Sequence, residues 1–276
     1  WLIAKLATIY IEIFRNIPLL LQIIFWQIAV LQTLPGPRQS LRIGDAFFLN
    51  NRGVFLPDPN FGKEFIFVIS AFLISLLGAY IFKIWAKRTQ EKTGRQYPVV
   101  YVSLGLIIGL PTIIFFLVGM PLTWEYAKLE RFSFSGGANI IPEFISLLWA
   151  LTMYTAAFIA EIVRSGILAV DHGQTEAARS LGLRNSLTLR LVVIPQALRV
   201  IIPPLTSQYL NLTKNSSLAT AIGYPDLVSV FMGTTLNQTG QAVEIVAMTM
   251  AVYLTFSLFI SMFMNWYNKR VSLVER

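Results

Sequence analysis

A run of polar residues between positions 206 and 217 is the part of this chain best suited to hold a charged solute. It follows an apolar stretch and ends with Lys214, Asn215, Ser216 and Ser217. Polar side chains at membrane depth are costly and often mark a path for ions or solutes. Lys214 would then offer a positive charge to a carboxylate of the solute. Alternatively, the run ends a helix at the membrane surface and Lys214 extends into water, and the sequence leaves both interpretations open.

Three prolines stand at or before the start of this polar run, at Pro195, Pro203 and Pro204. Proline has no backbone N–H, so carbonyl groups are left free and the helix bends. The pattern predicts a broken helix that lines a translocation path. Gln22 and Gln27 stand in another apolar segment, where we expect hydrogen bonds to a neighbouring helix. Gln22 is in addition a candidate for the same path.

A second polar segment, GQTEAARSLGLRNSLTLRLVVIPQ at 173–196, predicts a helical hairpin. Asp171 or Thr175 is the expected cap of the first helix, and Glu176 is expected in its first turn. This helix carries a small apolar face, which consists of Ala177, Ala178 and Leu181.

Gly182 is expected to end the first helix, because glycine readily takes the left-handed conformation that closes a helix. Asn185 or Ser186 is the expected cap of the second helix. The loop 173–190 therefore forms a compact surface element. It is either a docking site for a partner or only an interfacial connection between two spans.

Other chemistries lack the residues they need. The chain has one histidine and no cysteine, so neither a metal site built on these ligands nor a cysteine nucleophile is expected. No phosphate-binding G-x-x-x-x-G-K-[ST] loop is present, so nucleotide hydrolysis would need a partner and no cofactor is expected on this chain. The net charge of +8 comes from scattered residues and not from a basic patch, so nucleic acid is not an expected partner.

Composition places the chain in a lipid bilayer. It is 55% hydrophobic and only 13% charged, with a mean hydropathy of +0.62, which leaves too little polar surface for a soluble globule. The expected fold is an all-α polytopic membrane protein with about six transmembrane helices, because the apolar runs are continuous and reach spanning length. They are residues 9–33, 64–85, 98–119, 141–163, 191–212 and 242–266.

The distribution of lysine and arginine orients these spans. If the basic loop 86–97 faces the cytoplasm, alternation of the spans places most of the 22 basic residues on that side, as the positive-inside rule requires. The loop 173–190 and the C-terminus are then cytoplasmic. The loop 34–64 and the segment after residue 119 face outward.

The residues 176–195, EAARSLGLRNSLTLRLVVIP, resemble permeases of ATP-binding-cassette importers. In that family Glu-Ala-Ala is followed by a glycine six residues after the glutamate and later by an apolar pair before proline. Glu176, Ala177, Ala178, Gly182 and Pro195 match these positions. The flanking stretches YIEIFRNIPLLLQ, YTAAFIAEIVRSGI and PQALRVIIPPLTSQYLNLTKNSSLA are similar to the polar amino-acid branch. The insertion at 34–140 resembles general L-amino-acid and glutamate/glutamine/aspartate/asparagine permeases.

This resemblance implies a function and a set of partners. The chain would be a single transmembrane permease domain, 1–276, of an ATP-driven importer in the bacterial inner membrane. The helix pair 64–119 would be an insertion, and the loop 173–190 would be a coupling helix that docks on an ATPase. The partners would be two ATP-binding subunits, a second permease subunit and a periplasmic amino-acid-binding protein. Family members begin with a further helix, so we expect that the sequence lacks an N-terminal span.

Two other classes explain less of the sequence. A secondary transporter predicts an internal repeat and several charged residues well inside the spans, and we find neither beyond Glu161 and Lys214. Glu161 itself is expected to pair with Arg164 on the same helix face. A membrane scaffold without transport activity accounts for the hairpin but not for the proline-rich polar span.

Overall fold

The computed structural model describes residues 1–131 and 133–271. The chain forms two compact units. The first consists of Trp1–Ser40, Leu49–Val54 and the residues from Ile140 onward, and the second consists of Leu41–Phe48 and Phe55–Asn139. The predicted cytoplasmic tail begins at Asn268, and its part from Ser272 onward lies outside the described residues.

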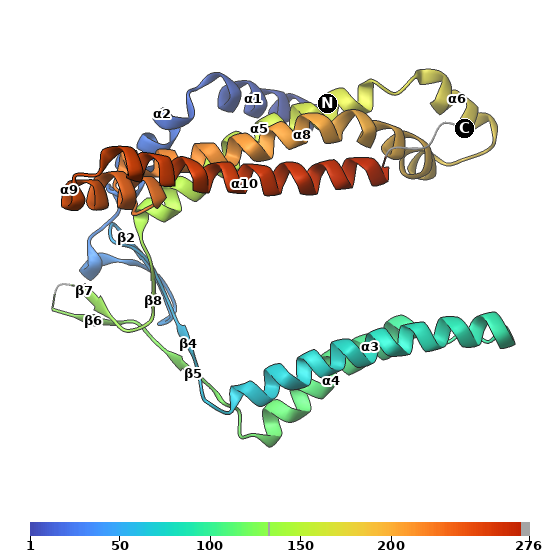
Figure 1. Ribbon diagram of the computed structural model, residues 1–276, viewed down its shortest axis with the longest axis horizontal. Helices are drawn as coiled ribbons and strands as arrows, with labels where there is room; N and C mark the ends of the chain where they lie inside the picture. The colour runs from blue at the N-terminus through green and yellow to red at the C-terminus, as the bar shows by residue number, and fades with distance from the viewer. Residues whose placement is uncertain (132, 272–276) are drawn as a thin grey trace. The chain divides into compact units, whose positions relative to one another are not determined.

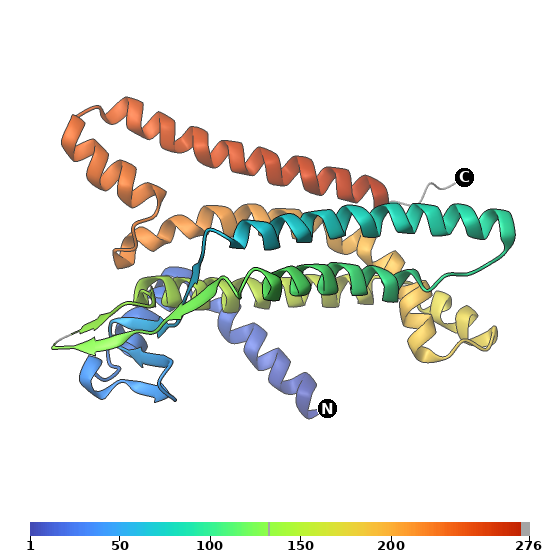
Figure 2. The ribbon, with the colours of Figure 1, turned by 90° about the horizontal axis from the view of Figure 1, so that it is seen from below.

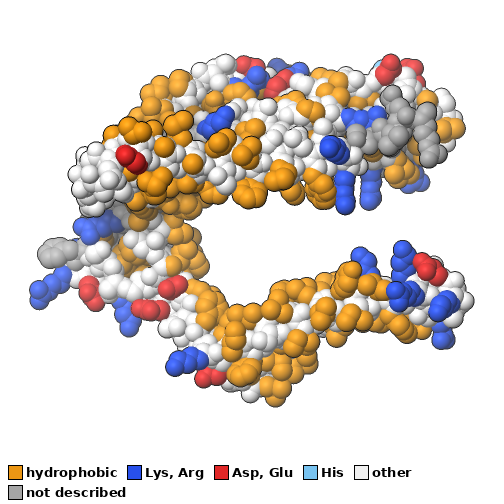
Figure 3. Space-filling view, viewed as in Figure 1, with side chains coloured by type: hydrophobic (Ala, Val, Ile, Leu, Met, Phe, Trp, Pro, Cys, Tyr) orange, Lys and Arg blue, Asp and Glu red, His pale blue; other side chains and the backbone are white. Residues whose placement is uncertain are grey.

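Five helical segments of the described chain are long and apolar enough to cross a membrane, and a bent pair makes a sixth candidate. This confirms the all-α polytopic class. The five are α3 (Phe65–Thr93), α4 (Val99–Leu117), α5 (Pro142–Leu168), the segment Asn185–Ile222 and α10 (Ala242–Val271). Large apolar side chains are exposed on these helices, and Figure 3 shows them in orange. A lipid environment requires such surfaces.

The prediction of one continuous helix for the first span is wrong. Instead of one helix over 9–33, the chain forms α1 (Leu2–Asn16), α2 (Leu19–Ile24) and the π-helix η1 (Phe25–Leu31), with a bend of 103° between α1 and the rest. The break lies at Pro18. A residue before proline is pushed out of the helical region, and Ile17 is accordingly extended, with φ −95° and ψ 129°.

The helix pair at 64–119 forms as predicted from its apolar length. α3 and α4 lie antiparallel and side by side (Figures 1 and 2). Small residues of α3 are buried, among them Ala71, Ser75 and Ala79, and small side chains let two helices approach closely in a membrane. Gly94, with φ +71°, closes α3 before the turn to α4.

The predicted outward connections contain short strands. β1 (Leu41–Ile43), β2 (Phe47–Asn50), β3 (Gly53–Leu56) and β8 (Ala138–Ile140) form one sheet in that order. β4 (Asp58–Phe61) pairs antiparallel with β5 (Leu122–Glu125), and β6 (Lys128–Glu130) pairs with β7 (Ser133–Ser135). The rings of Phe48 and Phe55 pack on Phe134 with centroid distances of 4.6 and 4.8 Å.

α5 is the central helix of the first unit. It packs against α1, α2, η1 and α8 (Ile194–Asn215) and against the 3₁₀ segment η4 (Ser216–Ile222) (Figure 1). The core cluster joins Leu19 and Ile23 of α2 to Leu147 and Ala150 of α5 and to Ala219 of η4. This packing fixes the end of the polar run 206–217 against α5.

The positive-inside orientation gives a first testable prediction. The chain has no cysteine, so a single cysteine at exposed Gln90 reports its own side of the membrane. In intact cells we expect Gln90→Cys to resist an impermeant thiol reagent and Asp45→Cys, in the exposed turn between β1 and β2, to react. Labelling of Gln90→Cys from outside would contradict the predicted topology.

Candidate functional site

The predicted hairpin at 173–190 forms, and Asp171 starts it. α6 (His172–Ser180) has Asp171 as its N-cap, whose Oδ1 accepts a hydrogen bond from the Gly173 backbone N–H at 2.6 Å. Of the two expected caps, Asp171 is therefore the right one. Because the helix begins at His172, the expectation that Glu176 lies in its first turn is wrong. Glu176 lies one turn later, with Oε1 3.1 Å from Nδ1 of His172.

Gly182 closes α6 as predicted. Its φ is +77°, and the backbone N–H groups of Gly182 and Leu183 donate to the carbonyls of Arg179 and Ala178. This is the left-handed termination that glycine favours. The second helix, α7 (Asn185–Thr188), has Arg184 and not Asn185 or Ser186 at its N-cap position, without a side-chain cap bond. That expected cap is wrong because the helix starts one residue earlier.

The hairpin presents a defined outer face. Glu176 and Ala177 are exposed, and Leu181 is 82% exposed. Ala178, in contrast, is only 4% exposed, so its small side chain serves packing inside the hairpin. Toward the membrane spans, Gln196 Nε2 of α8 donates to Gln174 Oε1 of α6 at 3.2 Å. α6 is thus tied directly to the helix that leads to the polar run.

The proline-rich span does not break where the sequence predicted. α8 is continuous through Pro203 and Pro204. The departures from regular helix lie at its two ends instead, as the π-helix η3 (Leu189–Val193) before Pro195 and as η4 after Asn215. A π-turn shifts the hydrogen-bond ladder by one residue, which accommodates the missing N–H of Pro195.

The polar run ends at the turn from α8 into η4. The Ser216 and Ser217 hydroxyls donate to the carbonyls of Thr213 and Lys214 at 2.8 and 2.6 Å. Lys214 is exposed and Asn215 is half-buried. The serines therefore satisfy carbonyls at the helix end, while their oxygens keep lone pairs for a further donor.

Gln22 lies at the bend in the first apolar segment and is 6% exposed. Its Nε2 donates to the carbonyls of Phe14 and Ile17, both at 3.0 Å, so it satisfies backbone groups freed by the break at Pro18. Gln27 Nε2 donates to Glu143 Oε1 at 3.2 Å, and Ser146 Oγ donates to Gln27 Oε1 at 2.7 Å. The expected bond to a neighbouring helix is therefore confirmed for Gln27. For Gln22 it is wrong, because Gln22 bonds to backbone groups of its own predicted span.

The expected pair on α5 also forms, because Arg164 Nη1 lies 3.4 Å from Glu161 Oε2. Sequence reasoning missed Asp226, which lies between η4 and the π-helix η5 (Ser229–Thr235). Its Oδ1 accepts from the Thr220 hydroxyl at 2.7 Å and from the Ser229 N–H at 2.8 Å. The position just before a helix was the available signal, but it indicates only a cap.

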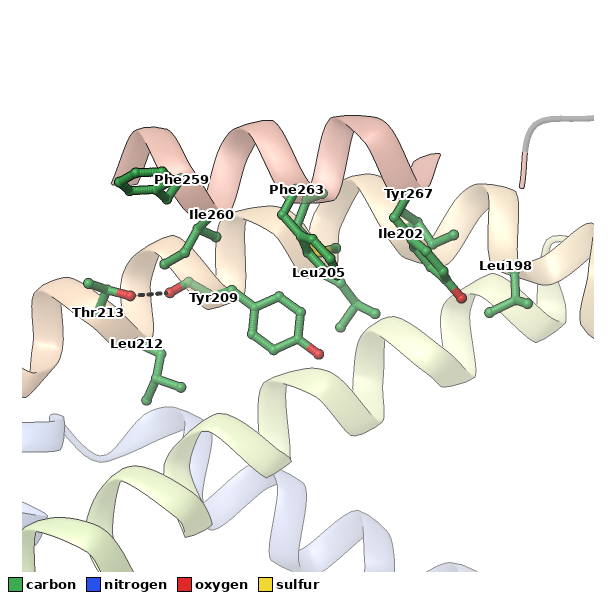
Figure 4. Close-up of a pocket in the computed structure, with 11 residues that line it drawn as sticks. Leu198, Ile202, Leu205, Tyr209, Leu212, Thr213, Phe259, Ile260, Phe263 and Tyr267 are labelled. Atoms are coloured by element: carbon green, nitrogen blue, oxygen red, sulfur yellow. Dashed lines mark hydrogen bonds between the residues drawn. The ribbon is translucent and has the colours of Figure 1, made fainter. Parts of the chain in front are cut away.

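An apolar groove of about 760 Å³ lies between α8 and α10 (Figure 4). Its polar lining is limited to Tyr209, Thr213 and Tyr267, and the Thr213 hydroxyl already donates to the Tyr209 carbonyl at 3.0 Å. No lining residue is charged. The groove therefore suits an apolar surface better than a charged or zwitterionic solute.

Comparison with known proteins places these features in context. Residues 84–273 match the family described as "Binding-protein-dependent transport system inner membrane component". The protein YhdX of Escherichia coli is 58% identical, and the match covers 100% of this chain and 70% of that protein. The general L-amino acid transport system permease protein AapQ of Rhizobium johnstonii is 53% identical over 100% of this chain and 69% of its own length. The glutamate/glutamine/aspartate/asparagine transport system permease protein BztB of Rhodobacter capsulatus is 43% identical. The match covers 100% of this chain and 72% of that protein.

Proposed function

The chain belongs to the family of binding-protein-dependent transport system inner membrane components, and from this premise we propose that it forms the translocation path of an ATP-driven importer of L-amino acids. The observation that carries the proposal is similarity along the whole chain to the permeases of a general L-amino-acid system and of a glutamate, glutamine, aspartate and asparagine system. The proposed substrates are these four amino acids or a broader set of L-amino acids.

The proposed complex contains further subunits. We assign ATP hydrolysis to two separate ATP-binding subunits, because this sequence has no phosphate-binding loop of the G-x-x-x-x-G-K-[ST] type. A second permease subunit and a periplasmic amino-acid-binding protein complete the importer. The permease lies in the bacterial inner membrane with its C-terminus in the cytoplasm, in agreement with the basic loop 86–97.

The hairpin is the proposed docking element for the ATPase. Glu176 and Ala177 would contact the ATPase surface, with the exposed Leu181 beside them. Ala178 and Gly182 would act indirectly, since one is buried in the hairpin and the other sets its turn. Movement of the ATPase subunits would reach α8 through Gln174 and Gln196, a rigid-body type of switching.

The substrate path is proposed to pass the end of α8. Lys214, Asn215, Ser216 and Ser217 lie together where α8 gives way to a 3₁₀ helix, and Lys214 offers its charge to the substrate carboxylate. Gln22 belongs to this proposal through its Oε1, which is buried and has no donor in the described part of the chain.

Reconstitution tests the proposed function. In proteoliposomes that contain this chain, the second permease and the ATPase, with binding protein outside, we expect uptake of labelled L-glutamate or L-glutamine that depends on ATP inside. An ATPase subunit that cannot hydrolyse ATP is the control and should abolish uptake. Uptake driven by an ion gradient without ATP would contradict the proposal and favour a secondary transporter.

A further inference from the structure

A pocket of about 830 Å³ lies between the hairpin and the ends of two membrane spans. α5 ends at Leu168 and the next spanning segment begins at Asn185, and both residues line the pocket. α6 lies beyond the end of α5 (Figure 1). The ends of spans lie at the level of the lipid headgroups, so lipid molecules surround this pocket in the membrane.

The polar part of the pocket comes mainly from α6 and its cap. Asp171, Thr175 and Arg179 line it, and their spacing of four residues places them on one face of the helix. Asp171 and Arg179 are exposed, so a ligand can reach both. Neither takes part in the two ion pairs found in the described residues, whereas His172, which also lines the pocket, pairs with Glu176. The pocket therefore offers a carboxylate and a guanidinium at separate places, with a hydroxyl between them.

The rest of the lining is largely apolar. It includes Ile167 and Leu168 at the end of α5 and Leu189 and Val193 of η3. Leu168 is 71% exposed and Leu189 is 45% exposed. Exposed apolar side chains at the end of a span suit the acyl chains of a lipid better than a small solute in water. The pocket thus combines an apolar wall with two opposite charges.

We propose that this pocket binds a phospholipid with a primary ammonium group, phosphatidylethanolamine. Arg179 binds the phosphate, because a guanidinium donates paired N–H groups to phosphate oxygens, and the Thr175 hydroxyl adds a donor. Asp171 binds the ammonium group, which carries three N–H donors, through the oxygen that does not cap α6. The acyl chains lie along Leu168 and Leu189.

Two other phospholipids match the pocket less well. Phosphatidylcholine has a quaternary ammonium group without an N–H donor, and phosphatidylglycerol has no positive charge for Asp171. The proposed site therefore selects by headgroup. This inference concerns the surrounding lipid and does not depend on which solute is transported.

Photo-crosslinking measures this selection. The chain, with the subunits that purify with it, is reconstituted in phosphatidylcholine vesicles with a trace of a probe. The probe is phosphatidylethanolamine, phosphatidylcholine or phosphatidylglycerol, each with the same photoreactive group on an acyl chain. Crosslinks mapped to 167–170 and 189–193 are divided by those on α4, which has no charged residue. We expect this ratio to be about two- to fivefold higher for the phosphatidylethanolamine probe, the size of an exposed charged contact.

Two variants assign the charges. Asp171→Asn keeps a side-chain oxygen that can cap α6 but removes the charge, so the preference for phosphatidylethanolamine should disappear. Arg179→Gln should lower the ratio for all three probes, because each carries a phosphate. Arg184→Gln is the matched control, since Arg184 is an exposed arginine of the same hairpin that does not line the pocket, and it should leave the ratios unchanged.

Several results would overturn the inference. Equal ratios for the three probes in the wild type would do so without any variant, even if a variant fails to fold. A preference that persists in both Asp171→Asn and Arg179→Gln, or that falls equally in Arg184→Gln, would also contradict it. Loss of the crosslinks on addition of excess L-glutamate would assign the pocket to a free amino acid instead. None of these results depends on ATP-dependent uptake, so they leave the proposed function to its own test.

Discussion

Replacing Gly182 with valine is expected to lower ATP-dependent uptake strongly while leaving the chain inserted in the membrane. The φ of Gly182 is +77°, and a Cβ added there would meet nothing within 4 Å. Steric contact is therefore not the problem, and the strain lies in the backbone alone. A β-branched residue is strongly disfavoured in the left-handed region. A strain of about 1–3 kcal/mol lowers the population of the correct turn by about 5- to 150-fold.

The consequence reaches the docking face. Without the left-handed residue, the bonds from the Gly182 and Leu183 N–H groups to the carbonyls of Arg179 and Ala178 cannot both form. The angle between α6 and α7 changes, and Glu176 and Ala177 point elsewhere. Recovery of the ATPase subunits on purification should then fall together with uptake.

Two variants sharpen this experiment. Gly182→Asn should retain much of the activity, because asparagine tolerates the left-handed conformation. Gly36→Val is the matched control, since Gly36 also has open space around it but has a φ of −67°. Full uptake and full ATPase recovery in Gly182→Val would mean that the hairpin only connects two spans.

The apolar spans could be predicted from the sequence because length and continuity alone define them. Pro18 carried the signal for the break in the first span, but hydropathy averages over such a residue and hides it. Among the short strands, the pairs β3–β8 and β4–β5 join distant segments, and no local pattern specifies such pairing.

The candidate site was predictable only where local chemistry determines it. Asp171 and Gly182 take their predicted roles because a cap and a left-handed turn depend on a few adjacent residues. Asp226 was missed because the hydrogen bonds that its carboxylate accepts from Thr220 and Ser229 depend on how the chain turns between η4 and η5. The burial of Ala178 beside the exposed Ala177 likewise follows from how the hairpin packs.

Gly166 provides the last prediction, because it lies where α5 closely approaches Ala197 and Ile201 of α8. A Cβ at Gly166 would lie 2.2 Å from Cγ1 of Ile201 and 3.4 Å from the carbonyl oxygen of Ala197. Ile201 is buried, and its branched side chain has few rotamers with which to move away. Gly166→Ala should therefore destabilise the fold by about 1–3 kcal/mol, the usual cost of overpacking, and lower the midpoint of thermal unfolding in detergent.

A double variant shows whether this contact is the cause. Ile201→Ala removes Cγ1 and alone should destabilise the chain by leaving a cavity. Combined with Gly166→Ala, it should cost less than the sum of the two single changes, because the added methyl enters the vacated space. Gly78→Ala in α3, where a Cβ would meet nothing within 4 Å, is the control and should not lower the midpoint, because alanine favours a helix more than glycine does. Strictly additive losses in the double variant would mean that α5 and α8 do not meet at Gly166 and Ile201. The path from the hairpin to the polar run would then have to be supported by other contacts.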